Sequence, residues 1–351
     1  MMIVSGQDVK RLLRGKEGRI IDAVSSAYRM HAAGRSSLPN SLFLTFPDDD
    51  CNRIIALPAH LGGERPLTGI KWISSFPGNV KMGLDRASAV LIMNSCKTGH
   101  VEAILEGAVI SAKRTAASAA LAARHLHSGQ ECNTLGIVGC GLINCEIVRF
   151  VVGEFPQIER VILFDSEAGK ASDVRAQYQE ASGGREILVA TERDAVLRSS
   201  QLISFATTAG KPYLGDLSGC PGTCTILHVS LRDLSVEAVL SADNVVDDID
   251  HVCHAGTSLH LAEKRQGNRD FIRCSLGDIL AGHQPPRKPS GKPVIFSPFG
   301  LGILDLAVGD LVLTFAAEEG MGSQVPSFHP DSWRKLRGLE EVPPREKDEA
   351  T

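Results

Sequence analysis

The 351-residue sequence predicts an α/β protein in which a doubly wound parallel sheet is joined to a smaller α+β part. Three observations support this fold class. Apolar strand-like runs alternate with helical patterns over residues 128–305, which is typical of parallel βαβ units. Residues 1–127 instead combine one long helical pattern with strand-like runs separated by Pro, Gly and Asp clusters. In addition, a Gly-x-Gly turn joins one predicted strand to the helix that follows it.

The first part is expected to contain a helix followed by an antiparallel sheet. Apolar residues recur at helical spacing from about Gln7 to Ala33, which predicts a helix over that range. β-Branched and aliphatic residues then predict four strands, at Ser41–Phe46, Arg53–Leu57, Leu67–Ser74 and Ala87–Asn94.

The second part is expected to alternate strands with helices. Gly282–Pro293 is predicted to be a loop from its prolines and glycines, and Gly302–Glu319 a helix that returns to the first part. The predicted domain limits are therefore 1–127, 128–305, a returning helical segment at 306–335 and a flexible tail at 336–351. The predicted strands are Leu135–Val138, Val161–Asp165, Ile187–Ala190, Leu202–Ala206, Ile226–Val229, Asn244–Asp247 and Val294–Phe296.

The glycine turn has the features of a dinucleotide site. Gly139 permits a tight turn from strand to helix, and Gly141 lets the backbone approach a pyrophosphate. Leu142 and Ile143 begin the helix, where free N–H groups can bind an anion. Asp165 ends the next strand, 24 residues beyond Gly141, where a carboxylate can accept ribose hydroxyls and repel a 2′-phosphate. The sequence therefore predicts a Rossmann domain that binds NAD rather than NADP.

One position departs from this pattern. Asn144 stands where a third glycine usually allows the helix to pack closely on the strand. We therefore expect NAD to bind, but less tightly than in a turn with all three glycines. An ordinary glycine turn in an α/β domain is the alternative, but the order of strand, turn, helix, strand and acid favours the dinucleotide site.

Composition excludes several other classes of protein. Hydrophobic residues make up 43%, charged residues 22%, and the net charge is −4, as expected for a globular protein. The sequence lacks a basic stripe with interleaved aromatic residues, so it does not predict a nucleic-acid partner. No secretory signal and no long apolar run is present, so we expect a cytoplasmic protein without membrane association.

The cysteines are not expected to form disulfides or a metal site. There are nine, an odd number, and no CxxC pair occurs. Cys220 and Cys224, together with His251, Cys253 and His254, resemble zinc ligands in type. Cytosolic cysteines more often act as small hydrophobic residues, so no metal is predicted.

Arg114 is the first residue that indicates chemistry. It precedes an Ala-rich, strongly helix-forming run in Ser111–Leu126, so Lys113 and Arg114 are expected in or beside the first helical turn. A helix N-terminus and a guanidinium together could bind a carboxylate or phosphate. The alternative is a surface ion pair, for example with Glu106.

Lys71 interrupts the apolar strand Leu67–Ser74. If it points inward, burial lowers the pKa of its amine towards a range useful for proton transfer. If Ile70 and Trp72 point inward instead, Lys71 is simply exposed, and alternation by itself leaves both possibilities open. Arg86 is a weaker candidate for binding substrate, and Arg53 is an additional cationic candidate. For both, the alternative is a surface salt bridge.

Polar residues also follow two predicted parallel strands, where ligands bind in open α/β sheets. Thr207 and Thr208 follow Leu202–Ala206 and could contact a cofactor. Asp233 follows Ile226–Val229 and could act as a base. From its local sequence alone, a helix N-cap is the simpler interpretation of Asp233.

Together these motifs resemble the ornithine cyclodeaminase/μ-crystallin family over residues 5 to about 320. Within the family the similarity is greatest to the N-(2-amino-2-carboxyethyl)-L-glutamate dehydrogenases, which form L-2,3-diaminopropionate for siderophores and peptide antibiotics. The family motifs are Gly69–Lys71, Lys113–Ala117, Gly136–Gly141, Ala206–Gly210 and Ser297–Gly302, and the closer match is carried by Arg53–His60, Gly69–Ile73, Arg86–Ser88 and Val246–Asp248.

The resemblance implies a Rossmann domain beside an α+β domain that binds substrate and forms a homodimer through its sheet. It also implies that Lys71 and Arg114 hold the substrate α-carboxylate and that Asp233 is catalytic, which replaces the N-cap interpretation. This chain departs from the family at Ser230-Leu-Arg-Asp233, where the pattern is Val-Gly-Gly-Asp. It also has Pro39-Asn40-Ser41 where cyclodeaminases carry an arginine.

The expected reaction is NAD-dependent oxidation of the secondary amine N-(2-amino-2-carboxyethyl)-L-glutamate to 2-oxoglutarate and L-2,3-diaminopropionate. Three alternatives remain open. An ornithine or lysine cyclodeaminase would show no net NADH, and an alanine dehydrogenase or ketimine reductase would act on smaller substrates. A μ-crystallin-like protein would bind nucleotide and a small ligand without turnover.

Overall fold

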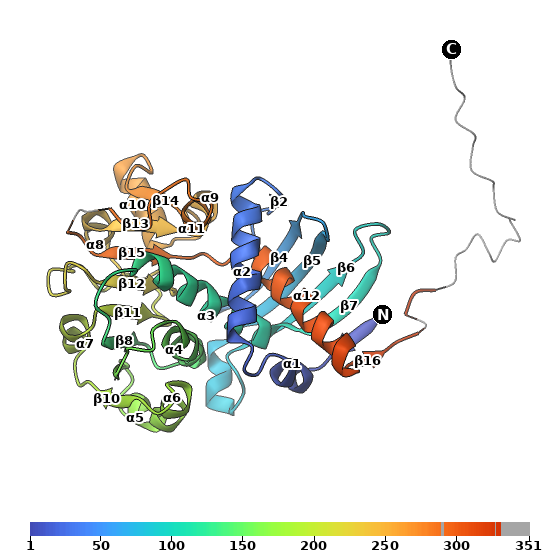
Figure 1. Ribbon diagram of the computed structural model, residues 1–351, viewed down its shortest axis with the longest axis horizontal. Coiled ribbons are helices and arrows are strands. Elements are labelled where there is room, and N and C mark those ends of the chain that lie inside the picture. Colours follow the sequence, from blue (N-terminus) through green and yellow to red (C-terminus); the bar gives the residue numbers. More distant parts are fainter. Residues whose placement is uncertain (289–290, 327, 331–351) are drawn as a thin grey trace, which may run out of the picture.

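The computed structural model describes residues 1–288, 291–326 and 328–330, and it contains two sheets with helices around and between them (Figure 1). One sheet is built mainly from the first 106 residues and the other from residues 134–297. This arrangement confirms the predicted α/β class, with a Rossmann-type sheet beside an α+β part.

The first sheet is mainly antiparallel, as predicted, with one parallel pair between β1 and β7. Its strand order is β16-β1-β7-β6-β5-β4-β2, and β3 pairs with β4. The sequence patterns did not predict four of the strands, at residues 2–4, 36–37, 101–106 and 323–324. Its strands are β1 (Met2–Val4), β2 (Ser36–Ser37), β3 (Leu42–Phe46), β4 (Asp49–Leu61), β5 (Leu67–Ser75), β6 (Ala87–Asn94), β7 (Val101–Glu106) and β16 (Ser323–Gln324).

The second sheet is entirely parallel, with the order β10-β9-β8-β11-β12-β15-β13-β14. The strand order reverses at β8, with β9 on one side and β11 on the other. A ligand is therefore expected in the crevice outside the carboxyl end of β8. All seven predicted strands are present, and the Cys-containing β14 was missed. The strands are β8 (Thr134–Val138), β9 (Arg160–Phe164), β10 (Glu186–Val189), β11 (Leu202–Phe205), β12 (Thr225–His228), β13 (Asp243–Val246), β14 (Ile272–Ser275) and β15 (Val294–Ser297).

Helices cover both faces of the parallel sheet but one face of the other sheet (Figure 1). In the first part these are α1 (Gly6–Leu12), α2 (Glu17–Ala32), the 3-10 helix η1 (Pro77–Met82), α3 (Gly107–Leu126) and α12 (Gly302–Glu319). In the second part they are α4 (Leu142–Glu154), α5 (Lys170–Asp173), α6 (Arg175–Ala181), α7 (Arg193–Ser199), α8 (Val236–Ser241), α9 (Ile249–Val252), α10 (Ser258–Gln266) and α11 (Leu276–Leu280).

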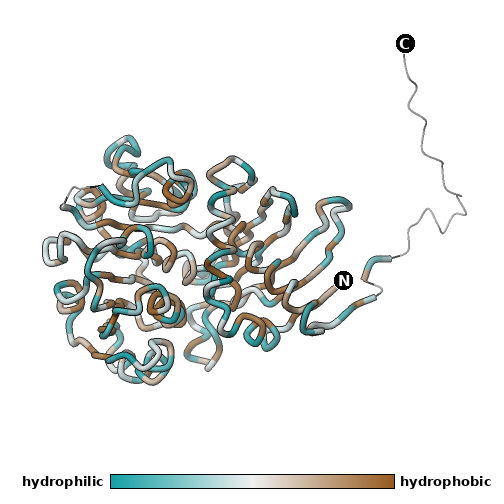
Figure 2. Tube along the Cα trace, viewed as in Figure 1, coloured by the Kyte–Doolittle hydropathy of each residue, from teal (hydrophilic) through white to brown (hydrophobic). Residues whose placement is uncertain are grey.

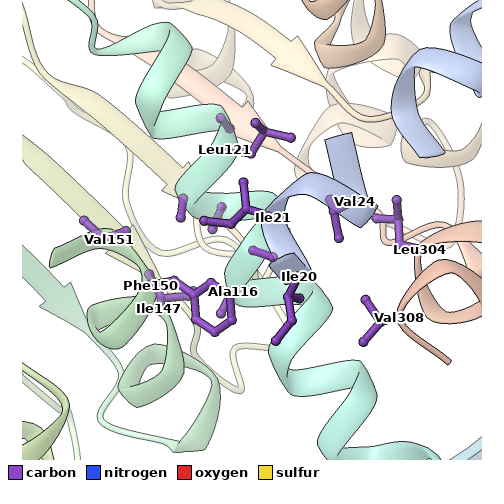
Figure 3. Close-up of a cluster of buried hydrophobic side chains, with 14 of the residues drawn as sticks. Ile20, Ile21, Val24, Ala116, Leu121, Ile147, Phe150, Val151, Leu304 and Val308 are labelled. Atoms are coloured by element: carbon purple, nitrogen blue, oxygen red, sulfur yellow. The ribbon is translucent and has the colours of Figure 1, made fainter. Parts of the chain in front are cut away.

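A continuous apolar core joins the two parts. In Figure 3, Ala116 and Leu121 of α3 lie between α4 and α2, and Leu304 and Val308 of α12 follow beyond α2. Figure 2 shows the apolar segments along the strands and along α12. Because burying apolar surface is the main stabilising term in folding, α3 fixes the first sheet against the second.

Two predicted helical segments differ in the structure. The helix predicted over Gln7–Ala33 is two helices, because Gly15 adopts φ 69° between α1 and α2, a left-handed conformation that a continuing helix does not permit. The returning helix α12 matches Gly302–Glu319, but Gly320, at φ 65°, ends it and β16 follows. The predicted segment 306–335 is therefore not one helix, and the predicted tail 336–351 lies outside the described residues.

Within the described ranges, the longest helices are too short or too polar to cross a bilayer. The Gly282–Pro293 segment has no helix or strand in its described residues, as predicted.

Candidate active site

The glycine turn between β8 and α4 leaves room for a ligand. Gly139 has φ 92°, and an added Cβ would lie 2.6 Å from the Ala206 carbonyl oxygen, so only glycine fits there. A Cβ on Gly141 would meet no atom within 4 Å. Gly141 is also the N-cap of α4 and provides no side-chain cap, so the N–H groups of Leu142 and Ile143 are free for an anion. This geometry fits a pyrophosphate.

Asp165 follows β9 and contacts the same turn. Its Oδ2 accepts a hydrogen bond from the Cys140 N–H at 2.7 Å, and its Oδ1 accepts from the Glu167 N–H at 2.9 Å. Lys170 Nζ lies 3.7 Å from Oδ2. The carboxylate is therefore held beside the predicted pyrophosphate position, as a ribose-binding acid must be.

Asn144 braces the turn instead of loosening it. Its side chain is buried and its Nδ2 donates to the carbonyl oxygens of Val138 (3.0 Å) and Gly139 (2.7 Å). Its Oδ1 accepts from Ser204 Oγ at 2.7 Å, which ties α4 to β11. The amide thus replaces the close packing that a third glycine allows with three hydrogen bonds, and looser NAD binding stays a prediction.

A buried charge cluster lies where the two sheets approach each other. Lys71 Nζ donates to Asp305 Oδ2 at 2.8 Å and to Ser111 Oγ at 3.1 Å. Arg114 Nε donates to the other carboxylate oxygen, Asp305 Oδ1, at 3.2 Å. We call Lys71, Arg114 and Asp305 the charge triad. The inward orientation of Lys71 excludes the alternative in which it points to solvent, and Trp72 is exposed instead.

Asp305 was missed from the sequence. It is a single acid in the apolar run Gly302–Val308 of the returning helix, and it is fully buried. A charged residue inside an otherwise apolar helix is rarely buried without a partner. The single acid in this apolar run therefore indicated a buried carboxylate with a cationic partner. Its two partners come from β5 and α3, which the sequence does not place beside α12.

Arg114 was predicted to lie in or beside the first turn of its helix, but the structure places it further along the helix. The helix α3 begins at Gly107, and Glu106 caps it by accepting from the N–H groups of Ala108 (2.7 Å) and Val109 (3.0 Å). The N-terminus of α3 is therefore occupied and provides no anion site. Burial of Arg114 also excludes the alternative of a surface pair with Glu106.

The loop after β15 closes over Arg114. An added Cβ at Gly300, which has φ 95°, would lie 2.7 Å from Arg114 Nη1. This loop is held by Asp247, whose carboxylate accepts from the N–H groups of Phe299 (2.8 Å) and Gly300 (2.7 Å). The parallel sheet thus contributes directly to the surroundings of the charge triad.

The electrostatic surroundings change the protonation of Lys71. Burial lowers the pKa of its amine, the positive charge of Arg114 lowers it further, and Asp305 opposes both; the resulting pKa is about 8. Lys71 is therefore mostly charged at neutral pH but loses its proton in a range that an assay can reach.

Asp233 is completely buried and accepts several hydrogen bonds. Oδ1 accepts from Thr207 Oγ1 and from Tyr213 OH (2.9 Å), and Oδ2 accepts from Ser230 Oγ. His228 Nε2 lies 3.3 Å from Oδ2. Burial would raise the pKa of Asp233, but the contacts with His228, Ser230 and Thr207 lower it to about 2. Ser235, and not Asp233, caps α8, so the N-cap interpretation is wrong.

The other predicted site residues, Thr207, Thr208 and Arg86, are less buried than Lys71, Arg114 and Asp233. The Thr207 hydroxyl is engaged with Asp233, whereas Thr208 is exposed in the same loop. Arg86 is exposed just before β6. Tyr213 and His228, which contact Asp233, were not singled out from the sequence. Among the described residues, no group of three or more His, Cys, Asp or Glu side chains has an arrangement that could hold a metal ion.

These features define an α/β protein with a dinucleotide-type turn and a basic cluster suited to a small carboxylate. The ornithine cyclodeaminase/mu-crystallin family model matches residues 1–319, so the chain belongs to this family. It is 26% identical to the N-((2S)-2-amino-2-carboxyethyl)-L-glutamate dehydrogenase of Staphylococcus aureus, over 92% of this chain and 97% of that protein. It is 27% identical to the alanine dehydrogenase of Archaeoglobus fulgidus, over 93% and 98%.

Solved structures show the same fold. A dimeric archaeal alanine dehydrogenase with bound NAD has a TM-score of 0.83 and 26% identity, covering 93% of this chain and 99% of that one. The Δ(1)-pyrroline-2-carboxylate reductase of Thermococcus litoralis, in complex with NADH and L-proline, has a TM-score of 0.85 and 24% identity, covering 93% and 100%.

Proposed function

We propose that the protein uses NAD⁺ to oxidise N-(2-amino-2-carboxyethyl)-L-glutamate and releases L-2,3-diaminopropionate and 2-oxoglutarate, for siderophore or peptide antibiotic synthesis. Family membership and the activities of the relatives support the broader class, an NAD-dependent oxidoreductase. The observation that carries the proposal is the buried charge triad beside the carboxyl edge of the Rossmann-type sheet.

The cofactor would be held by the turn after β8. Gly139 and Gly141 give it access to the backbone, Leu142 and Ile143 provide N–H groups, and Asp165 would accept the ribose hydroxyls. Thr208, exposed in the loop after β11, is a further proposed contact. Bound NAD⁺ would supply the acceptor for the hydride that leaves the glutamate Cα.

The charge triad would bind the α-carboxylate of the substrate. With Lys71 protonated, two cations share one carboxylate, Asp305, so the triad carries a net positive charge that an incoming carboxylate can neutralise. Arg114 can also form two parallel hydrogen bonds with such a group. Fixing the carboxylate orients the Cα–H bond, and positioning of this kind supplies much of the catalysis.

Asp233 would act on the nitrogen side of the reaction. Loss of the hydride leaves an iminium, to which water adds before the carbon–nitrogen bond breaks. The sequence suggested that Asp233 takes a proton from the amine or the water. A carboxylate with a pKa of about 2 is a weak base, so we propose that it mainly stabilises the positive charge of the iminium, while Lys71 exchanges protons.

We further propose a cytoplasmic homodimer that forms through the first sheet. The face of this sheet opposite Lys71 exposes Leu42, Leu44 and Trp72. Exposed apolar patches of this kind mark protein interfaces. The domain limits 1–127 and 128–305 belong to the same proposal, with α12 completing the substrate-binding part.

The test is incubation of the purified protein with NAD⁺ and one amine at a time. The proposal expects NADH and the masses of both products from N-(2-amino-2-carboxyethyl)-L-glutamate. NADH from alanine would favour an alanine dehydrogenase, which the A. fulgidus relative supports as the second candidate. Conversion of ornithine without net NADH would identify a cyclodeaminase. Tight nucleotide binding without any turnover would identify a binding protein.

The role of Asp233 has its own test. We expect Asp233→Asn to lower kcat by at least about a hundredfold, the range usual for lost transition-state charge stabilisation. Binding of NAD⁺ should remain near that of the wild type, which also reports that the variant is folded. Turnover close to the wild-type value would show that Asp233 has no part in catalysis.

A further inference from the structure

Two adjacent acids, Asp247 and Asp248, follow β13 and contact different parts of the molecule. The sequence singled out Val246–Asp248, and the proposed reaction gives this segment no role. Asp247 is fully buried, and its carboxylate accepts from the N–H groups of Phe299 and Gly300, in the loop that closes over the guanidinium of the charge triad. Asp248 instead contacts α2 of the first part.

The two carboxylate oxygens of Asp248 have different partners. Oδ1 accepts from the His251 N–H at 2.8 Å, which caps α9, and it also lies 2.8 Å from His251 Nδ1. Oδ2 lies 3.0 Å from Nε2 of His31, in the last turn of α2. Burial would raise the pKa of Asp248, but the contacts with His251 and His31 lower it well below its usual range, so the carboxylate is charged. Helix capping needs only Oδ1, so the contact with His31 is an additional role.

His31 connects Asp248 to the elements that carry the charge triad. Its Nδ1 lies 2.7 Å from the Ser36 Oγ of β2, so the imidazole is held at both nitrogens. The helix α2 packs against α3 and α12, which carry Arg114 and Asp305. Holding α2 at Asp248 therefore fixes the position of both residues relative to the parallel sheet.

Asp248 also supports the loop after β15. Its N–H donates to Asp247 Oδ1 at 2.9 Å, the oxygen that accepts from the Phe299 N–H. The centre of the His251 ring lies 6.3 Å from that of the Phe299 ring. The loop is thus held at its backbone by Asp247 and at its aromatic side chain by a histidine that Asp248 orients. Since an added Cβ on Gly300 would lie 2.7 Å from the guanidinium of the charge triad, a small shift of the loop changes the space around that group.

We infer that Asp248, together with His31, is a positioning residue for the substrate. The pair holds the two parts of the molecule at the separation at which the Gly300 loop and the charge triad form one carboxylate site. This inference rests on the proposed function and deepens it, because it assigns a role in substrate binding to residues outside the triad and the glycine turn. Spacing of this kind matters, since a misplacement of about 1 Å can cost about a hundredfold in rate.

The experiment separates the contact with His31 from the helix cap. Asp248→Ser keeps a good N-cap residue but is too short to reach His31. His31→Leu removes the imidazole, whereas His31→Gln keeps an N–H donor for Asp248. Asp250→Ser is the matched control, because Asp250 is an acid of the same helix and its side chain is 83% exposed. Calorimetry gives the Kd of NADH for each variant, and the Kd of 2-oxoglutarate, the proposed product, for the NADH-saturated protein.

We expect Asp248→Ser and His31→Leu each to weaken 2-oxoglutarate binding by at least about tenfold, while NADH binds as in the wild type. The double variant should bind about as weakly as either single variant, because both changes remove the same contact. His31→Gln and Asp250→Ser should bind like the wild type. Unchanged 2-oxoglutarate affinity in Asp248→Ser, or an equal loss of affinity for 2-oxoglutarate and NADH, would overturn the inference.

Hydrogen exchange provides a measurement that needs no substrate. The Phe299 and Gly300 N–H groups are bonded to Asp247, so the peptide that contains them should exchange faster in Asp248→Ser and His31→Leu than in the wild type or Asp250→Ser. Unchanged exchange of this peptide would contradict the inference. If the proposed function fails, the tricarboxylate amine yields no NADH in the wild type, and the exchange of the loop still decides whether Asp248 positions it.

Discussion

At the scale of single residues, the charge triad is the feature that most constrains function. Two cations, Lys71 and Arg114, share the buried carboxylate of Asp305, and removal of a partner from such a cluster is strongly destabilising. The same pairing leaves the cluster short of one negative charge. The net positive charge of the triad, which depends on the protonation of Lys71, makes this buried site well suited to bind a carboxylate.

The pKa of Lys71 gives a prediction about pH. Carboxylate binding favours the charged amine, so affinity should be full below pH 8 and should fall as pH rises through about 8, by up to tenfold per unit. Titration calorimetry with 2-oxoglutarate between pH 6.5 and 9.5 measures this, with NADH saturating. In Lys71→Gln the affinity should be lower and its inflection near pH 8 should vanish. A wild-type affinity that stays constant over this range would rule out Lys71 as an anion ligand.

Asn144 gives a prediction about stability. Asn144→Ala would leave the Val138 and Gly139 carbonyl oxygens and the Ser204 hydroxyl without their partner in a buried position. We expect the free energy of unfolding in urea to fall by about 2 kcal/mol, within the usual range for buried groups left unsatisfied. NAD⁺ should also bind several-fold more weakly. Ser204→Ala removes one of the three bonds and should cost less; an equal cost would assign the effect to Ser204.

At the scale of secondary structure, single backbone positions decide where helices start and stop. Glu106 ends β7 and caps α3, so one residue fixes both the strand end and the helix start. That start places Arg114 in the second turn, where it reaches Asp305 instead of the helix end. Gly15 similarly separates α1 from α2, and the separation lets both helices pack against α12.

Gly15 and Gly18 form a matched pair for testing the helix break. Both are exposed, and an added Cβ would meet nothing within 4 Å at either position. Gly15 has φ 69°, so Gly15→Ala should destabilise the protein by about 1 kcal/mol through backbone strain. Gly18 lies inside α2, so Gly18→Ala should stabilise it by up to about 1 kcal/mol. Urea unfolding measures both, and changes of the same sign would contradict the explanation.

At the scale of the whole molecule, the two faces of the first sheet differ in their environment. Lys71 and its neighbours face α3 and α12, whereas Trp72, with Ala56 and Val90 beside it, faces outward. Trp72 is 42% exposed and Leu42 is 69% exposed, unusual for large apolar residues in a sheet. One sheet thus provides the charge triad on one face and the proposed dimer surface on the other.

The dimer surface can be tested with one substitution. Trp72→Glu places a charge at the centre of the exposed face, and burying an unpaired charge in an interface is costly. We expect sedimentation velocity to show a dimer for the wild type and a monomer for the variant at micromolar concentration. Leu188→Glu is the control, since Leu188 is 38% exposed at the edge of the other sheet. A wild type that sediments as a monomer would end the proposal of a homodimer.

The sequence by itself determined most of the elements and the nucleotide turn. Strand alternation, helical periodicity and the glycines around Cys140 are local patterns, and local backbone preferences produce them wherever they occur. For that reason α12 was predicted at its observed bounds, and the turn from β8 to α4 was placed correctly. Short strands such as β1 were missed because three residues carry too little pattern.

Only the tertiary structure decided which charges meet. Lys71 and Asp305 are 234 positions apart in the chain, and no local pattern pairs them. The direction of Lys71, the brace made by Asn144 and the four side chains around Asp233 likewise depend on neighbours from other elements. Burial and hydrogen bonding set the pKa of a group, and both arise only when distant segments pack together.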